Sequence, residues 1–467
     1  MRKHGNWLKP AAASLLLAGM LAGCGSGSSG SGSAEAGQAS AGGAAAEVET
    51  IRLWHNNTSE FLKRKMDEFN ETIGKEQGIF IDFRTMGGEY ADALKVALAA
   101  NQGPELYMFV GTVKDPFINS GWMLPIEDFE GGAAFLQDYE GLIIPEYNTY
   151  KDKTYSVPFK VITTKMIYNK RLFEKAGIAK VPQTWDEVVD AAKKITAAGE
   201  GKEFGYGTHL KDAGSMGGKW SNAVMFAPSV GHMGYDFTKG QYDFASFTPI
   251  LEKIMQMKKD KSIFPGAEGM AIDNLRAQFA EGRVGIMMGA NWEVISFNDS
   301  FPAKDDWGVA PVPVLDPAHR YKEYAQVGDF LVIGPAAKEK AAKSFIVYKY
   351  VHSLEFQRDM YEEGFEFMAV PRVMEGATPP AKKGWAEFAD LSTSYFTKTP
   401  PDGVLKLEGD TYQNTIAKIL AGGASDIRKE LESLDKRYNA ALQKAINEGF
   451  DPAPFIDENW DIRMNTP

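Results

Sequence analysis

The chain has 467 residues, of which 24% are charged and 44% hydrophobic, and its formal net charge is −11 at pH 7. This length fits two or three domains, or two large lobes with a shared core, and the composition excludes a disordered chain, a collagen and a disulfide scaffold. The excess of acidic over basic residues, 62 against 51, argues against nucleic acid as a partner, because nucleic-acid binding requires a basic surface.

Residues 1–23 have the layout of a secretory signal peptide. Lys and Arg residues precede a short apolar run over residues 11–22, which is too short to span a membrane. The run closes on Leu-Ala-Gly-Cys, and Cys24 is the single cysteine of the chain, so it forms no disulfide within the chain and no zinc cluster. These four residues resemble the bacterial lipobox, in which a peptidase cuts before a cysteine that carries a diacylglycerol. The resemblance implies a lipid anchor at Cys24.

Residues 24–46 are predicted to be the lipidated cysteine and a flexible tether. Residues 25–46 consist almost entirely of Gly, Ser and Ala, a composition that has nothing to bury and is typical of a disordered linker. A coil of this length spans roughly 25 Å. The globular part is therefore expected to work at the extracytoplasmic face of the cell membrane.

From residue 47 on, the pattern becomes that of a packed α/β protein. Alternating apolar residues predict strands over residues 51–55, 79–83 and 106–110, separated by segments with helical spacing. Strands that alternate with helices at this pitch indicate βαβ units and a parallel sheet. In such sheets ligands lie beyond the carboxyl ends of the strands, where Trp54 and Phe109 stand.

The later elements follow the same reasoning. An extended stretch is predicted over residues 157–169, and Thr184 with Glu187 forms a capping box that begins a helix. Strands are predicted over residues 284–288 and 327–333, and helices dominate from residue 338 to 447. No repeat of 20–50 residues is visible, which argues against solenoids and propellers.

Motifs for catalysis, metals and cofactors are absent. The sequence contains no HExxH, GxSxG or EF-hand pattern, and its histidines are scattered without metal-ligand spacing. We therefore expect no metal and no cofactor. The Gly-rich segment before Trp220 fails the glycine spacing of a phosphate loop, and it is interpreted as a flexible loop that presents Trp220.

Four segments together resemble the family 1 extracellular solute-binding proteins of ABC importers, the group that includes maltose-binding protein. Their order and spacing cover residues 48 to about 445. The segments are Gly103-Pro-Glu with its following strand, Tyr155-Ser-Val-Pro-Phe with Tyr168-Asn-Lys and Pro182-Gln-Thr-Trp-Asp-Glu, Phe279-Ala-Glu-Gly-Arg-Val-Gly-Ile-Met-Met with Asn291-Trp292, and Trp307-Gly-Val-Ala-Pro-Val-Pro with Val327-Gly-Asp329.

The resemblance implies an α/β, two-lobed periplasmic-binding-protein type II fold, with a hinge and a ligand cleft between the lobes. By position, the chain should cross between the lobes near Lys160, Pro313 and Pro371. Lobe 1 would then comprise residues 47–160 plus 314–371, and lobe 2 residues 161–313 plus 372–467.

A sugar is best held by aromatic side chains that stack on its C–H face and by planar polar groups at its hydroxyl rim. Trp292 matches the cleft tryptophan of the family. The stacking candidates are Trp54, Phe109, Trp220 and Trp292, and the hydrogen-bonding candidates are Asn56, Lys160, Asp329 and Asp410.

Each candidate also has a structural alternative. Trp54 and Phe109 could be core residues at the ends of their strands, and Asn56 could cap the helix after the first strand. Asp410 precedes a helix and could be its cap. Lys160 and Asp329 could be hinge or surface charges.

Two departures from the family pattern argue against maltose specificity. The family often has Asp after Gly-Pro, where this chain has Glu105. Ile162 stands where maltose-binding protein places a sugar-binding acid.

The leading hypothesis is a lipid-anchored, monomeric receptor that binds a sugar or oligosaccharide and delivers it to the membrane subunits of an ABC importer, without catalysis. One alternative is a surface-tethered glycoside hydrolase, which would need two carboxylates about 5–9.5 Å apart. Another is the same fold with a non-sugar solute, such as a polyamine or ferric ion.

Overall fold

The computed structural model describes residues 48–56, 60–86, 89–110, 114–145, 147–211, 216–396 and 400–464, without the side chains of residues 216–222. The predicted leader, Cys24 and the tether lie outside these residues. Within the described ranges, no helix combines the length and the hydropathy that a membrane span requires.

The first sheet has four strands in the order β13-β3-β1-β2. The strand β1 (Glu49–His55) lies parallel to β2 (Ile79–Thr85) and to β3 (Leu106–Tyr107), and β13 (Val332–Ile333) runs antiparallel to β3. The parallel βαβ arrangement predicted for this part is confirmed. The third strand is shorter than predicted, because only Leu106 and Tyr107 pair with β1.

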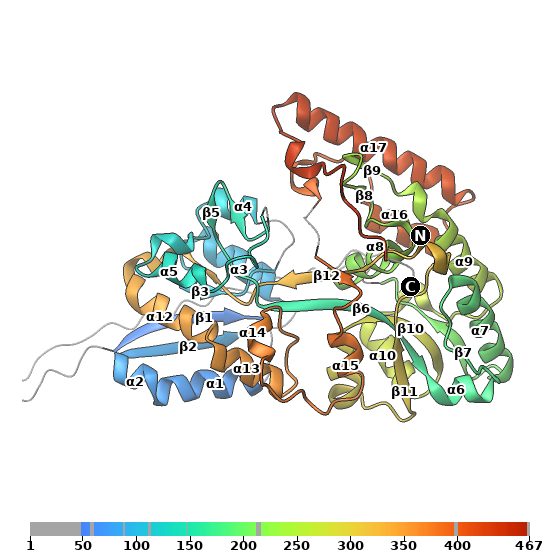
Figure 1. The fold of residues 1–467 in the computed structure, drawn as a ribbon, viewed down its shortest axis with the longest axis horizontal. Coiled ribbons are helices and arrows are strands. Elements are labelled where there is room, and N and C mark those ends of the chain that lie inside the picture. The colour runs from blue at the N-terminus through green and yellow to red at the C-terminus, as the bar shows by residue number, and fades with distance from the viewer. Residues whose placement is uncertain are drawn as a thin grey trace, which may run out of the picture. The chain divides into compact units, whose positions relative to one another are not determined.

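Amphipathic helices cover this sheet. The helix α1 (Glu60–Glu71) buries Phe61, Leu62 and Phe69, and both α1 and α2 (Ile73–Gln77) pack along β2 (Figure 1). The helix α3 (Tyr90–Ala99) buries Tyr90, Leu94 and Leu98, the spacing that the sequence predicted.

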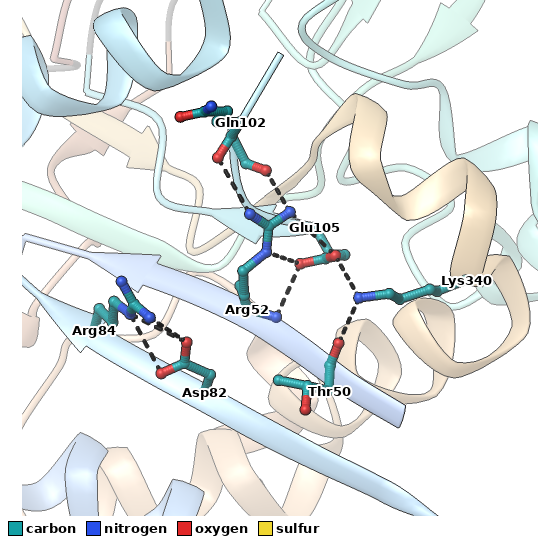
Figure 2. Close-up of polar contacts among 8 residues, drawn as sticks. Thr50, Arg52, Asp82, Arg84, Gln102, Glu105 and Lys340 are labelled. Atoms are coloured by element: carbon teal, nitrogen blue, oxygen red, sulfur yellow. Dashed lines mark hydrogen bonds and ion pairs between the residues drawn. The ribbon is translucent and has the colours of Figure 1, made fainter. Parts of the chain in front are cut away.

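A buried carboxylate ties the elements of this sheet together (Figure 2). Glu105, which precedes β3, accepts hydrogen bonds from the backbone amide and the guanidinium of Arg52 and from Nζ of Lys340 at 2.9 Å. Lys340 also donates to the carbonyl of Thr50 at 2.7 Å. Burial alone would raise the pKa of Glu105, but the hydrogen bonds from Arg52 and Lys340 outweigh burial and lower the pKa. Glu105 is therefore a structural group of the first sheet.

The second sheet has six strands and is organised around the long strand β6 (Lys160–Asn169). The strands β10 (Val284–Ala290), β11 (Trp307–Ala310) and β12 (Glu323–Gly328) all run antiparallel to β6. The edges are β7 (Phe204–Gly207), parallel to β10, and β14 (Ser394–Tyr395), parallel to β12. Figure 1 shows β6 and β12 side by side.

Three connecting segments meet where β6 begins. The amide of Phe159 donates to the carbonyl of Gly328 at 3.0 Å, the amide of Val161 to that of Phe367 at 2.8 Å, and the amide of Ala369 to that of Phe159 at 2.9 Å. We call residues 159–161, 328–329 and 367–369 the connecting segments. Backbone hydrogen bonds hold these three segments to one another.

The prediction of one strand over residues 327–333 is wrong. The first part pairs in the second sheet as β12 and the last part in the first sheet as β13. Both parts are buried and apolar, so the sequence reads as one run, whereas Gly328 and Asp329 mark the break. The chain therefore changes sheets between Gly328 and Val332, later than the expected crossing near Pro313.

The capping box is confirmed: the hydroxyl of Thr184 accepts from the amide of Glu187 at 3.2 Å, and Glu187 accepts from the amide of Thr184. The predominance of helices after residue 338 is also confirmed, interrupted by β14. The remaining elements are α4 (Asp115–Asn119), α5 (Gly132–Gln137), β4 (Thr149–Tyr150), β5 (Lys153–Thr154), α6 (Lys170–Lys175), α7 (Trp185–Ala198), α8 (Met216–Val230), β8 (Tyr235–Asp236), β9 (Gln241–Tyr242), α9 (Thr248–Lys259), α10 (Ile272–Ala280), α11 (Glu293–Ile295), α12 (Ala341–Val351), α13 (Leu354–Glu362), α14 (Pro371–Met374), α15 (Trp385–Ala389), α16 (Tyr412–Leu420) and α17 (Ile427–Asn447).

Candidate functional site

The carboxyl ends of β1 and β3 are fixed by a tyrosine of α3. The hydroxyl of Tyr90 donates to the carbonyl of Met108 at 2.7 Å and lies 3.1 Å from that of Trp54. The amide of Met108 in turn donates to the carbonyl of Trp54 at 3.0 Å. Trp54 and the segment that carries Phe109 are therefore held side by side.

Trp54 and Phe109 are neither fully buried nor free of the core. Both are half-buried and pack against the buried cluster that contains Tyr90, Leu94 and Tyr107. Other half-buried aromatic side chains join them in edge-to-face contacts, because Phe117 lies 5.2 Å from the ring of Phe109 and 5.2 Å from that of Trp122. The ends of these strands therefore present a group of partly exposed aromatic rings, as a sugar-stacking surface requires.

Asn56 directly follows β1 and is half-buried. It stands next to Trp54 and His55 at the same end of the sheet. Residues 57–59 lie outside the description, so the alternative of a helix-capping role for Asn56 stays a prediction.

Asp329 is engaged by a lysine that the sequence analysis did not select. Nζ of Lys114 lies 2.8 Å from Oδ2 of Asp329, and both side chains are buried. Nδ2 of Asn148 donates to Oδ1 of Asp329 at 3.3 Å, and Nζ of Lys114 also donates to the carbonyl of Tyr147 at 2.9 Å. The same ammonium lies 3.7 Å from the ring centroid of Tyr147. Asp329 is thus part of a buried network that joins a connecting segment to the region after β3.

Lys160 lies in a connecting segment and is ion-paired. Its Nζ lies 3.3 Å from Oε2 of Glu366, and both side chains are partly exposed. The side chain of Lys160 packs closely against Gly328, because a β-carbon at Gly328 would lie 2.9 Å from Cγ of Lys160. Burial, together with the positive charge of Lys160, lowers the pKa of His55 to about 3. Lys160 therefore lies close to the end of β1.

Trp292 is exposed at the start of α11. Its side chain is 38% exposed, while the following residues Val294 and Phe297 are buried. Phe297 packs 4.7 Å from the ring of Phe279 on α10. An exposed indole on a well-packed element is the arrangement expected of a binding residue, because large apolar side chains on such elements are normally turned inward.

Two expectations need correction. Residue 220 lies within the helix α8, not in a loop, and residues 223–228 of the same helix are all buried. The side chain of Trp220 lies outside the described residues. Asp410 does not cap α16: Thr411 does, through its hydroxyl and the amide of Asn414. Asp410 is exposed, and its carbonyl accepts from Arg437 at 2.7 Å.

The buried carboxylates bear on the hydrolase alternative. In the part of the chain that the structure describes, each buried Asp or Glu side chain takes part in an ion pair. In the same part, no three His, Cys, Asp or Glu side chains lie close enough to hold a metal ion. The buried carboxylates are Glu105, Asp236, Glu293, Glu323 and Asp329.

Local sequence patterns carry no signal for the contacts of Lys114, Tyr90 and Tyr147. Each of these side chains contacts a residue that is far away in the sequence, as Lys114 does in its ion pair with Asp329. Pattern analysis reads neighbours at fixed spacing, so it had no signal for these pairs.

Comparisons with known proteins agree with this architecture. A protein of Brucella abortus that is named only as a binding protein is 27% identical, over 62% of this chain and 74% of its own length. The maltotriose-binding protein of Pyrococcus abyssi is 26% identical, over 56% of this chain and 53% of its own length.

A solved structure shares the fold. The ABC substrate-binding protein of Listeria monocytogenes in complex with cycloalternan superposes with a TM-score of 0.62 at 16% identity, over 84% of this chain and 99% of that one. The fold is accordingly the two-lobed α/β fold of such proteins. Residues 55–351 match the family model of the bacterial extracellular solute-binding proteins, and the chain belongs to that family.

Proposed function

We propose that this chain is an extracytoplasmic receptor that binds a sugar or oligosaccharide and delivers it to the membrane subunits of an ABC importer. The observation that carries the proposal is the set of partly exposed aromatic rings at the ends of β1 and β3, together with the exposed Trp292. Aromatic faces stack on the C–H faces of sugar rings, and nearby polar groups can bind the sugar hydroxyls. An apolar solute without hydroxyls would not need these polar groups. The relatives named for maltotriose and cycloalternan support the same ligand class.

The ligand-binding residues proposed here lie in three groups. Trp54, Asn56 and Phe109 lie at the ends of strands in the first sheet. Trp292 follows β10 in the second sheet. Lys160 lies in a connecting segment, where a change of backbone geometry would let the lobes close on the ligand.

Asp329 and Asp410 are the two acidic candidates, and only the first is given a different role. Because Asp329 is buried and paired with Lys114, we assign it to holding the region between the sheets rather than to direct contact with ligand. Asp410 is held through its backbone carbonyl by Arg437, and its exposed carboxylate remains a peripheral candidate.

The receptor is proposed to catalyse nothing. Its fully buried carboxylates are ion-paired. Burial raises the pKa of Asp435 to about 6, but this carboxylate accepts hydrogen bonds from the backbone amides of Phe244 and Ala245. We assign Asp435 this structural role rather than that of the general acid that a glycosidase needs. The relatives are binding proteins, which supports the same conclusion.

The receptor is proposed to be monomeric and anchored through a lipid on Cys24, with residues 25–46 as a tether. Expression of the full chain in a bacterium, followed by membrane fractionation, tests the anchor. The native chain should sediment with membranes and should incorporate a radiolabelled fatty acid. The Cys24→Ala variant should not incorporate the fatty acid, and equal labelling of both chains would contradict the anchor.

A thermal-shift screen of the chain from residue 24 on, with Cys24→Ala, tests the function. The panel contains maltotriose, xylotriose, cellotriose and raffinose, with spermidine and ferric citrate for the non-sugar alternatives. A ligand at about 100 times its Kd adds roughly 2.7 kcal/mol of stability. A sugar that raises Tm and is recovered intact by chromatography supports the receptor. A sugar recovered in cleaved form would make the chain an enzyme, and a shift with only spermidine or ferric citrate would replace the ligand class.

A further inference from the structure

Trp292 stands between two buried polar residues. Asn291 is 2% exposed and Glu293 is 1% exposed, whereas Trp292 is 38% exposed. A polar side chain that is buried this deeply requires hydrogen-bond partners. Both neighbours of Trp292 have such partners, and the partners come from different elements.

Asn291 attaches the segment before Trp292 to β6. Its backbone amide donates to the carbonyl of Thr163 at 3.0 Å. Its Nδ2 donates to the carbonyl of Val161 at 2.7 Å. Because Val161 also belongs to a connecting segment, the backbone on this side of Trp292 is fixed to the place where the two sheets are joined.

Glu293 attaches the segment after Trp292 to α10. Both of its carboxylate oxygens accept from the guanidinium of Arg276, with Nε at 2.8 and 3.1 Å and Nη2 at 2.6 Å. A two-pronged pair of this kind fixes the direction of both side chains. A β-carbon at Gly289 would lie 2.7 Å from Cγ of Glu293, so the carboxylate has little room for another position.

We propose that Arg276 and Glu293 are positioning residues that hold the indole of Trp292 in the orientation that stacks on a sugar ring. The inference rests on the proposed function. An exposed tryptophan on a free loop would lose rotational freedom when it binds, and this loss weakens binding. The Arg276–Glu293 pair fixes the backbone beside Trp292 before the ligand arrives, as pre-organised sites require.

The Arg276–Glu293 pair also stabilises the start of α11, and a test must distinguish this role from the orientation of the Trp292 indole. Loss of the stabilising role alone would change the free energy of unfolding. Such a loss would not make the effect of Arg276 on sugar affinity depend on the presence of Trp292.

The first test reads Trp292 directly and needs no ligand. The protein is labelled with 5-fluorotryptophan, and its ¹⁹F resonance is assigned with Trp292→Phe. We expect Arg276→Ala to shift or broaden the Trp292 resonance while the other resolved tryptophan signals keep the wild-type pattern.

The matched control is Asp273→Asn, which removes the exposed partner of the same guanidinium, 2.8 Å from Nη1, and leaves Glu293 paired. An unchanged Trp292 resonance in Arg276→Ala would overturn the proposal. If that variant does not fold, Arg276→Lys, which keeps the charge and loses the two-pronged pair, takes its place under the same criterion.

The second test is a double-mutant cycle on affinity for whichever of maltotriose, xylotriose, cellotriose and raffinose binds. Arg276→Ala should weaken binding about tenfold in the wild-type background and should have no further effect in Trp292→Ala. An equal loss in both backgrounds would overturn the proposal. If none of the sugars binds the wild-type chain, the proposed function fails, while the ¹⁹F result still decides the positioning role.

Discussion

Nζ of Lys114 lies 2.8 Å from Oδ2 of Asp329, and the two side chains are only 5% and 6% exposed. This pair joins residues 215 positions apart in the sequence and connects the region after β3 to the segment that follows β12. Asp329 lies where the chain leaves the second sheet for the first. The pair is therefore placed to hold the aromatic end of the first sheet against a connecting segment.

Removal of the lysine should be costly. Lys114→Met leaves the Asp329 carboxylate buried without its cation, and we expect the free energy of unfolding to fall by about 3–5 kcal/mol in urea titrations. Lys114→Met combined with Asp329→Asn should recover part of this loss, because the unpaired charge is then absent. The exposed pair of Arg64 with Glu363 supplies the control, since Arg64→Ala should cost less than about 1 kcal/mol. Equal losses for Lys114→Met and Arg64→Ala would contradict this account of the pair.

The carboxylate of Glu105 is expected to stabilise the first sheet in a pH-dependent way. Glu105→Gln removes a charged acceptor of Arg52 and Lys340 and should cost about 2–3 kcal/mol at pH 7. Because the folded-state pKa of Glu105 is lowered, its contribution is present above the ordinary pKa of a glutamate and is lost as the pH falls. The difference in unfolding free energy between wild type and variant should therefore shrink in acid.

The control for Glu105 is drawn beside it in Figure 2. Asp82 pairs with Arg84 at 2.8 Å on the exposed side of β2. Asp82→Asn should cost less than about 1 kcal/mol at pH 7, because the pair is exposed. A pH-independent gap between wild type and Glu105→Gln would show that its charge is not what stabilises the sheet.

His352 should make the protein less stable in weak acid. Its ring is buried beside Tyr348, whose carbonyl lies 2.8 Å from Nδ1, and burial lowers the pKa of His352 from 6.5 to about 4. The unfolded chain therefore binds a proton between these values while the folded chain does not, so stability falls as the pH drops from 6.5 toward 4. The full effect is about 3 kcal/mol.

Urea unfolding at pH 7.5 and pH 4.5, with His352→Gln as the comparison, isolates this contribution. Between the two pH values the wild type should lose more stability than His352→Gln. Other groups titrate in both chains, so the difference between the two losses reports on His352. Parallel losses in the two chains would contradict the assignment to His352.

Trp292→Ala should weaken sugar binding with little effect on folding. The side chain is 38% exposed, so its removal creates no core cavity, and Tm should move by no more than a few degrees. Loss of the stacking face should raise the Kd at least tenfold, which corresponds to about 1.4 kcal/mol. Phe80, an exposed aromatic residue of β2, is the matched control. A similar loss of affinity in Phe80→Ala would show that the effect is not specific to the site.

The sequence predicts well those features that depend on local spacing. Alternating apolar residues located β1 to within two residues, and helical spacing placed helical segments between the strands, where α1 and α3 lie. Thr184 with Glu187 identified the start of α7. Strands and helices repeat their apolar side chains every two and every 3.6 residues, and a capping box spans four residues, so a short stretch of sequence is enough to recognise each. The order of motifs around Trp292 likewise led to the family that the comparisons confirm.

The features that failed depend on contacts between distant segments. The run from Val327 to Ile333 is apolar except for Gly328 and Asp329, and its pairing partners show that it belongs to two sheets. The pair of Asp329 with Lys114 joins residues far apart in the sequence, so no local pattern predicts it. The Gly-rich sequence at the start of α8 predicts a loop, because glycine is a poor helix former, but the backbone there is helical.

Calorimetric titration of the chain from residue 24 on, with Cys24→Ala, tests the central claim most directly. Maltotriose, xylotriose, cellotriose and raffinose are titrated separately, and each sugar is analysed by chromatography afterwards. We expect saturable binding of at least one sugar at one site per chain, recovery of that sugar intact, and weaker binding by Trp292→Ala. Cleavage of the sugar, or saturable binding that Trp292→Ala leaves unchanged, would show that the proposed receptor function or its site is wrong.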